Sequence, residues 1–210
     1  LPKVENIPEL AINVEGLKRH SLLMIFVSEP SLSIADRKLR TWLLHTVATA
    51  ARHYTKARLL VQTQNVADQS RGNDAIFHTL DVYEEIEGAV MAAHRACMAI
   101  RRLGSTSPVE CDFAKVYVYS LKALCAIRNQ YEHMHTQIAS NQTGPGPLSM
   151  TFSHEGRKIN FRSLYLDTVE LHCLIDRAFN FVAKMYPAFD ATSKPELPGP
   201  IKLAATCTVT

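Results

Sequence analysis

The chain has 210 residues, of which 47% are hydrophobic and 20% are charged. This size and composition suit one well-buried globular domain and exclude a disordered or fibrous chain. The formal net charge of +3 permits a nucleic-acid partner without requiring one. The five cysteines include no CxxC pair, which argues against a disulfide framework or a zinc site and predicts reduced thiols in a cytoplasmic protein. No apolar run reaches the roughly 18 residues of a membrane span, and no secretory leader is evident, so neither a membrane partner nor secretion is expected.

Two long amphipathic helices are predicted first, over about 33–65 and 74–103. Ser33 is followed three residues on by Asp36, which together form a capping box. Apolar residues then recur at intervals of three and four, the spacing of one buried face. In the first helix these are Leu39, Leu43, Thr46, Ala50, Tyr54, Ala57 and Val61, and in the second Ile76, Leu80, Tyr83, Ile86, Val90, Ala93, Cys97, Ile100 and Leu103. The sequence QSRGND between the helices supplies a turn.

A third helix over about 107–138 has the strongest start signal in the chain. Ser107 can cap it, Pro108 fits the first helical position, and Glu110 completes a capping box. Its apolar face continues through Tyr117, Leu121, Leu124 and Tyr131. The sequence GPGP at 144–147 ends the helix, because proline and glycine do not continue it.

The remainder predicts a small β insertion and one more helix. The sequence MTFSHEGRKINF, near 150–161, alternates around a Glu-Gly turn and is typical of a short hairpin. A last helix is expected over about 163–186, buried through Leu164, Thr168, Leu171, Ile175, Phe179 and Val182. Residues 1–187 are thus expected to form a single domain, and 188–210 a proline-rich C-terminal extension. The predicted class is all-α, an antiparallel four-helix bundle with a small β-hairpin insertion before the last helix.

The sequence RNQYEH at 128–133 is the main candidate for chemistry. It places Arg128 five residues before His133, with the polar amide of Asn129 directly after the arginine. This pattern resembles the Arg-x4-6-His signature of HEPN domains, which are small all-helical modules. A second Arg-x4-His match, Arg40 to His45, lies within a helix among core positions and is not expected to have a function.

The resemblance implies a metal-independent endoribonuclease of the toxin or defence class, acting on RNA as a homodimer with two motifs lining one cleft. His133 would be the general acid or base, since imidazole titrates near neutral pH and RNA carries its own nucleophile in the 2′-OH. Arg128 would hold the phosphate and stabilise its developing charge. Asn129 would position one of these groups. No metal and no cofactor are expected.

The spacing within the motif raises a geometric question. Five residues along an ideal helix correspond to about 500°, so the two side chains would lie roughly 140° apart around the axis. Either the helix loosens near Gln130, or the motif of a second copy completes the site. Asn129 stands one helical turn before His133 and could orient its ring or touch phosphate, while Tyr131 is expected to pack.

Further residues are expected to support the site. His135 also fits the looser motif spacing, and it stands where HEPN toxins with a nucleotidyltransferase antitoxin usually carry tyrosine, so this antitoxin subfamily is not favoured. The resemblance also implies acidic residues on the second predicted helix that could hold the arginine. The candidates are Glu84, Glu85 and Glu87, of which Glu84 and Glu87 share one face, and all three could instead be solvated. Glu132 could pair with Arg128 and make it less available to phosphate.

Two functions are carried forward from the sequence. In the first, RNA is cleaved at the motif and is tracked by Arg95, Arg101 and Arg102 near the end of the second predicted helix. In the second, the chain is a catalytically silent HEPN-like helical module that binds RNA, nucleotide or a protein partner, such as an antitoxin or regulatory protein. Nucleotide-cradling glycine loops and a GxSxG elbow are absent, which excludes many common enzyme classes.

Overall fold

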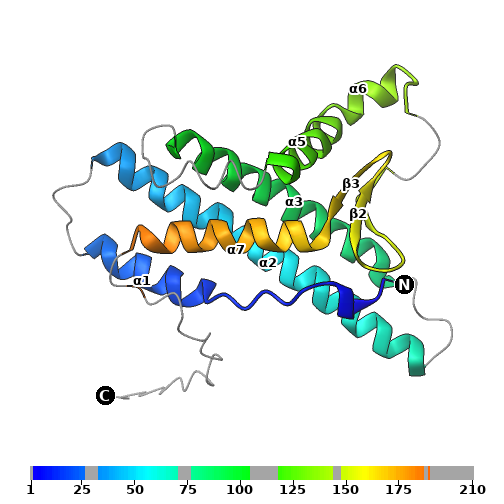
Figure 1. Cartoon of the computed structure of the whole chain (residues 1–210), viewed down its shortest axis with the longest axis horizontal. Helices are drawn as coiled ribbons and strands as arrows, with labels where there is room; N and C mark the ends of the chain where they lie inside the picture. Colours follow the sequence, from blue (N-terminus) through cyan, green and yellow to red (C-terminus); the bar gives the residue numbers. More distant parts are fainter. Residues whose placement is uncertain are drawn as a thin grey trace, which may run out of the picture.

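The computed structural model describes residues 2–26, 33–70, 77–104, 118–143, 148–186 and 189. Most of this part of the chain is helical, and it includes a small antiparallel sheet, as the sequence predicts (Figure 1). The helices are η1 (Val4–Asn6), α1 (Val14–Phe26), α2 (Ile34–Ser70), α3 (Phe77–Gly104), α5 (Val118–Glu132), α6 (Met134–Ala139) and α7 (Thr168–Lys184). None of the described helices is long and apolar enough to cross a membrane. Residues 71–74 of the predicted turn QSRGND, the sequence GPGP at 144–147, the caps at 107–110 and nearly all of the predicted extension 188–210 lie outside the described residues. The first two residues of that turn, Gln69 and Ser70, belong instead to α2, which is longer than the predicted 33–65.

Helices α2 and α3 form the long central pair, and their contacts show that they run antiparallel (Figure 1). The predicted apolar stripe of α2 is buried from Leu43 to Val61, because its side chains face α3 and α7. The stripe of α3 is buried from Ile86 to Ile100. Leu80 was expected in this stripe and is instead 68% exposed, because it lies about 160° around the helix axis from Val82, where the buried face of α3 begins.

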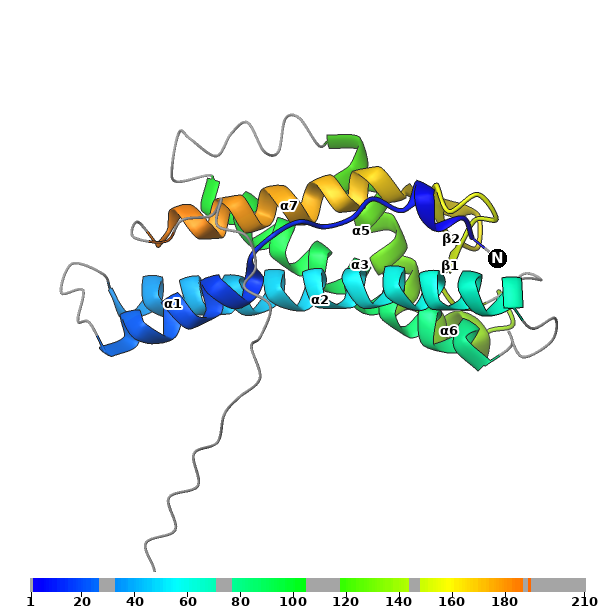
Figure 2. The same cartoon turned by 90° about the horizontal axis from the view of Figure 1, so that it is seen from below.

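The core divides into two regions along this central pair. One region joins α1, α2, α3 and α7 through Leu17, Val47, Ile100 and Phe179. The other joins α2, α3, α5 and the sheet, with Tyr54, Ile86, Leu124, Phe161 and Leu171 among its members. Figure 2 shows α7 lying over the α2–α3 layer, with α1 beside one end of α2. Helix α1 was not predicted, although Asn13 caps it by accepting a hydrogen bond from the Gly16 amide (2.8 Å).

The sheet has three strands in the order β1-β2-β3, formed by Thr151–Phe152, Lys158–Phe161 and Leu164–Asp167. The first two confirm the predicted hairpin. The third corrects the predicted start of the last helix at 163, because Leu164 pairs with Phe161 and Asp167 with Lys158. Helix α7 begins only at Thr168, where Asp167 caps it by accepting from the Val169 amide (2.9 Å).

The segment before α1 runs along the surface of the helices to the sheet (Figure 2). Ile7 is buried, and its carbonyl accepts a hydrogen bond from Arg58. The Tyr54 hydroxyl, which is buried in α2, donates to the Pro8 carbonyl (2.9 Å). At the hairpin, Gly156 has φ +72° and lies so close to the segment that a Cβ there would be 2.5 Å from the Lys3 carbonyl oxygen, so only glycine fits.

The third predicted helix is shorter than expected where it is described. Helix α5 ends at Glu132, His133 adopts φ −92° and ψ 6°, and the short helix α6 follows. One of the two alternatives for the motif was that the helix loosens near Gln130. Helix α5 instead runs unbroken through Gln130 to Glu132, and the change in backbone conformation lies at His133. Because 105–117 lie outside the described residues, the start of this helix and its place in a four-helix bundle stay predictions.

Candidate functional site

Arg128 stands on the last turns of α5, and its side chain is engaged within the motif. One guanidinium nitrogen donates to the Asn129 side-chain oxygen (3.0 Å), and another forms an ion pair with Glu132. The side chain remains 34% exposed. Asn129 therefore orients the arginine in this structure rather than the ring of His133, and Glu132 competes for the surface that a phosphate would use.

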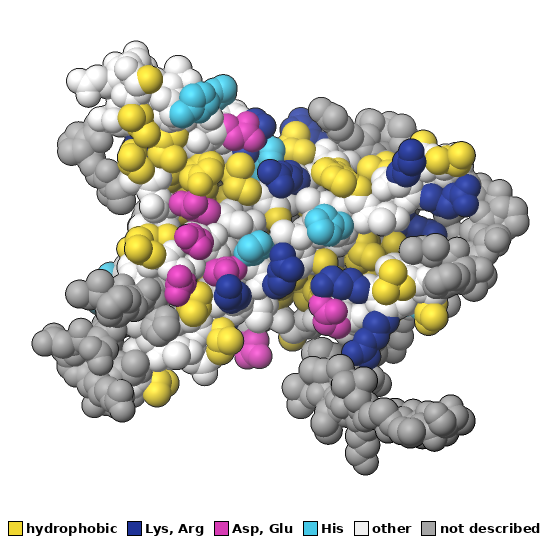
Figure 3. All heavy atoms as spheres, turned by 180° about the vertical axis from the view of Figure 1, so that it is seen from behind, with side chains coloured by type: hydrophobic (Ala, Val, Ile, Leu, Met, Phe, Trp, Pro, Cys, Tyr) yellow, Lys and Arg dark blue, Asp and Glu magenta, His cyan; other side chains and the backbone are white. Residues whose placement is uncertain are grey.

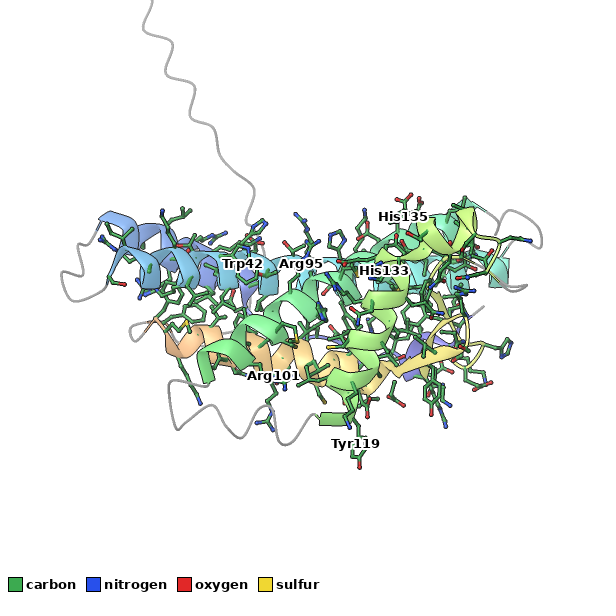
Figure 4. The ribbon with its side chains drawn as sticks, turned by 90° about the horizontal axis from the view of Figure 1, so that it is seen from above. Trp42, Arg95, Arg101, Tyr119, His133 and His135 are labelled. Atoms are coloured by element: carbon green, nitrogen blue, oxygen red, sulfur yellow. The ribbon has the colours of Figure 1, made fainter. Side chains whose placement is uncertain are left out.

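His133 lies at the break between α5 and α6. Its amide donates to the Asn129 carbonyl (3.2 Å) and its carbonyl accepts from Gln137 (3.1 Å), so its backbone continues the helical hydrogen bonds across the break. The imidazole is exposed and, within the described part of the chain, forms no hydrogen bond or ion pair. No hydrogen bond joins it to Arg128 among these residues. His135 is also exposed, on α6, and lies on the same side of the molecule as His133 (Figure 4).

Tyr131 anchors the motif to the rest of the fold. Its hydroxyl donates to one Glu87 carboxylate oxygen (2.7 Å), and the other oxygen accepts from the Met150 amide (3.2 Å). The ring packs against Phe161 of β2 with centroids 5.7 Å apart. Burial and the hydrogen bond to Glu87 raise the pKa of Tyr131 to about 12. Glu87 thus supports the site through Tyr131, joining α3, α5 and the sheet, and not through the arginine.

His94 of α3 is a site residue that the sequence analysis did not single out. Burial and the positive charge of Arg128 lower its pKa, while Glu132 acts in the opposite direction. The neutral form of His94 is thus favoured by its burial and by the nearby charge of Arg128. The spacing of Met91, His94 and Met98 by three and four residues places them on one side of α3. This side faces α5, since Met98 contacts Cys125 (3.8 Å).

A second polar cluster joins α2 and α3 at Glu85. This glutamate is 8% exposed, and its two oxygens lie 2.6 Å from His53 Nδ1 and 2.6 Å from Lys56 Nζ. Burial opposes ionisation of Glu85, but the hydrogen bonds from Lys56 and His53 outweigh it, so the pKa of Glu85 lies below its usual value. The predicted supporting residue Glu84 is exposed, and its charge acts on Lys56 instead of on the motif.

Of the three basic residues expected to track RNA, Arg95 and Arg101 have described side chains, and these lie on different sides of the molecule. Arg95 is exposed, and its charge acts on His94 beside the motif. In Figure 4, Arg95 lies with Trp42, His133 and His135 along one side of the molecule, whereas Arg101 and Tyr119 lie on the opposite side. Arg102 belongs to α3, but its side chain lies outside the described residues. Of the two described side chains, that of Arg95 is the one near the motif.

The face behind Figure 1 has a distinct charge pattern (Figure 3). Histidine and Lys or Arg side chains form a band across it over α2, α3 and α5, and acidic side chains gather toward one end. The motif contains one further unusual group, because Gln130 Oε1 is buried without a hydrogen-bond partner among the described residues. No group of three metal-ligating side chains occurs in the same part of the chain.

No protein-family model matches the chain, and comparisons with curated proteins and with solved structures find no match either.

Proposed function

We propose that the chain is a metal-independent endoribonuclease of the HEPN type, with an antiparallel helical bundle and its site at the junction of α5 and α6. The observation that carries this proposal is the helix break at His133, which leaves an exposed imidazole directly after the turn that holds Arg128. A toxin or defence role in the cytoplasm belongs to the same proposal, and it rests on the resemblance of the motif alone.

The proposed reaction is attack of the RNA 2′-oxygen on the adjacent phosphorus. The P–O bond to the 5′-oxygen breaks, which leaves a 2′,3′-cyclic phosphate and a 5′-hydroxyl. One group takes the 2′-hydroxyl proton, and another gives a proton to the departing 5′-oxygen. In this scheme His94, whose lowered pKa favours the neutral form, takes the 2′-hydroxyl proton, and a protonated His133 gives its proton to the departing 5′-oxygen.

Arg128 supplies charge stabilisation in this scheme. Its guanidinium is permanently positive and can grip two phosphate oxygens once it leaves Glu132. Asn129 then keeps the guanidinium in place through its side-chain oxygen. Within the described residues, no hydrogen bond joins Arg128 and His133. The proposal therefore includes a homodimer, in which the motif of the second copy completes the site.

The cleavage proposal is tested with mixed-sequence RNA in excess EDTA, comparing the wild type with His133→Ala. His154→Ala is the matched control, since His154 is an exposed histidine on the hairpin. We expect 2′,3′-cyclic phosphate ends from the wild type and the control, and about a hundred-fold or greater loss of rate in His133→Ala. Equal cleavage by His133→Ala would refute the assignment.

A second function is favoured by the contacts of Arg128. Asn129 and Glu132 both bind the guanidinium of Arg128, so this group has partners without a substrate. This arrangement suits a catalytically silent module that binds RNA, nucleotide or a regulatory protein partner. Binding of RNA by a dimeric wild type without any cyclic-phosphate product would support this second function over the first.

A further inference from the structure

Helix α2 carries an unbalanced positive charge. Residues 37–67 contain six Lys or Arg and two His residues and not one Asp or Glu. A helix that only needs solubility usually mixes both signs of charge on its exposed face. Three of these cations have partners in the fold, since Arg40 binds the Met185 carbonyl, Lys56 binds Glu85 and Arg58 binds the Ile7 carbonyl. The exposed charges of Arg37, Lys38 and Arg52 remain to face an anion.

The exposed side chains of this run form one ridge. Trp42, His45, Arg52 and Lys56 follow each other at intervals of three, seven and four residues, so they project from the same side of α2. Trp42 is 45% exposed, although a tryptophan would gain from burial. At 1.5 Å per residue, the ridge from Trp42 to Arg52 is about 15 Å long.

Helix α3 continues this ridge toward the motif. His53 packs against Gly88, so in the antiparallel pair the start of α2 lies level with the end of α3. Arg95 consequently lies beside the first half of the ridge, and Figure 4 shows it next to Trp42. Arg52 and Arg95 form no ion pair within the described residues. The charges of Arg95 and Arg128 both act on His94 of α3, so both arginines lie near this one histidine.

The opposite end of the ridge is closed to an anion by acidic groups. Lys56 is bound to Glu85, and the charges of Asp81 and Glu84 also act on it. A negatively charged strand that leaves the motif is thus repelled from the start of α3, where these acids lie, and attracted toward Arg95. The positions of the acidic and basic groups therefore favour one direction for a bound anionic strand, away from Lys56 and toward Arg95.

We propose that single-stranded RNA held at Arg128 runs across Arg95 and along the α2 ridge, where one base stacks on the indole of Trp42. This inference rests on the proposed function for the RNA site, and it adds the path of the strand and its single-stranded class. Exposed aromatic side chains flanked by cationic groups suit single strands, because unpaired bases have a free face for stacking. A duplex keeps its bases stacked inside and does not offer that face.

The test uses the intrinsic fluorescence of the protein, since Trp42 is its single tryptophan. The full chain is titrated with a 2′-O-methyl oligouridine, which lacks the 2′-nucleophile and so cannot be cut by the proposed reaction. We expect a saturable loss of Trp42 emission. In a binding assay with labelled oligonucleotide, Trp42→Ala is expected to weaken binding at least about five-fold.

The arginines are tested by the salt dependence of binding. Arg52→Gln and Arg95→Gln are each expected to reduce the slope of log affinity against log salt by about 0.7, the value for one lost phosphate contact to a single strand. Arg101→Gln is the matched control, because it removes the same charge from an exposed position on the other side of α3 (Figure 4). An equal effect of all three changes would overturn the path.

Other outcomes also separate the strand path from the proposed function. Emission loss with the modified RNA but no cleavage of unmodified RNA would keep the path and refute the ribonuclease. Cleavage with unchanged Trp42 emission would refute the path alone. A shift of Trp42 emission with phosphatidylserine vesicles, or with protein concentration, but not with RNA would assign the ridge to a membrane surface or to a second copy and overturn the proposal.

Discussion

Substitution of Gly88 by alanine tests how closely α2 and α3 approach each other. An added Cβ would lie 2.8 Å from both Cγ and Nδ1 of His53, closer than real Cβ contacts allow. These are atoms at the base of the ring, and the ring is held by the 2.6 Å contact of Nδ1 with Glu85. His53 therefore cannot turn away without breaking its bond to a buried carboxylate.

Two opposing terms set the expected magnitude. Alanine is a better helix former than glycine by about 0.5–1 kcal/mol, and with free space the change would stabilise the fold. Overpacking of a filled contact costs about 1–3 kcal/mol. We expect Gly88→Ala to lower the free energy of unfolding by about 1–2 kcal/mol, since the steric cost exceeds the gain in helix propensity.

Urea unfolding followed by circular dichroism measures this change, with His53→Ala as the second arm of a double-mutant cycle. In the His53→Ala background the space is free, so Gly88→Ala is expected to stabilise the protein. The sign of the Gly88→Ala effect should thus reverse between the two backgrounds. Stabilisation by Gly88→Ala in the presence of His53 would refute the close packing described for this helix pair.

Three further changes address the site and the last helix. Tyr131→Phe is expected to lower the free energy of unfolding by about 1 kcal/mol near pH 7 through loss of the bond to Glu87. Because the pKa of Tyr131 is raised from 10.0 to about 12, this contribution is complete below pH 10 and is lost as the pH rises toward 12, so unfolding curves of the two proteins should converge there. Asp167→Ala removes the cap of α7 and is expected to lower Tm, at a cost of about 1 kcal/mol, whereas Asp167→Asn should restore most of it. Glu132→Gln frees Arg128 and is expected to increase affinity for oligouridine up to about five-fold in a binding titration; unchanged affinity would show that the ion pair does not compete with phosphate.

Local patterns in the sequence were sufficient to predict the long helices α2 and α3 and the hairpin. The stripe from Leu43 to Val61 is buried as predicted, because a periodicity of 3.6 over so many turns has no other low-energy solution. Leu80 and the strand Leu164–Asp167 were assigned wrongly for a shared reason. Each lies at the end of an apolar pattern, where the partner element decides what is covered, and no partner can be identified from one chain segment.

The residues of the candidate site that are close in sequence could be predicted, whereas those contributed by another helix could not. Arg128, Asn129 and His133 are neighbours in sequence, so their pattern was visible at once. His94 reaches the site from another helix, and Glu87 binds Tyr131 instead of the arginine. Both depend on the rotation of α3 against α5, which the sequence periodicity leaves undetermined within one helical face.

The surface segment before α1 also affects how a minimal folded unit should be chosen. Its carbonyls at Ile7 and Pro8 bind side chains from the middle of α2, and its first residues contact the hairpin turn through Lys3 and Glu155 (2.9 Å). A truncation that began at the first long helix would open part of the hydrophobic core to water and leave Tyr54 with a buried, unpaired hydroxyl. Protease resistance of the hairpin should consequently decrease when residues more than 140 positions earlier are removed, although no peptide bond near the hairpin has changed.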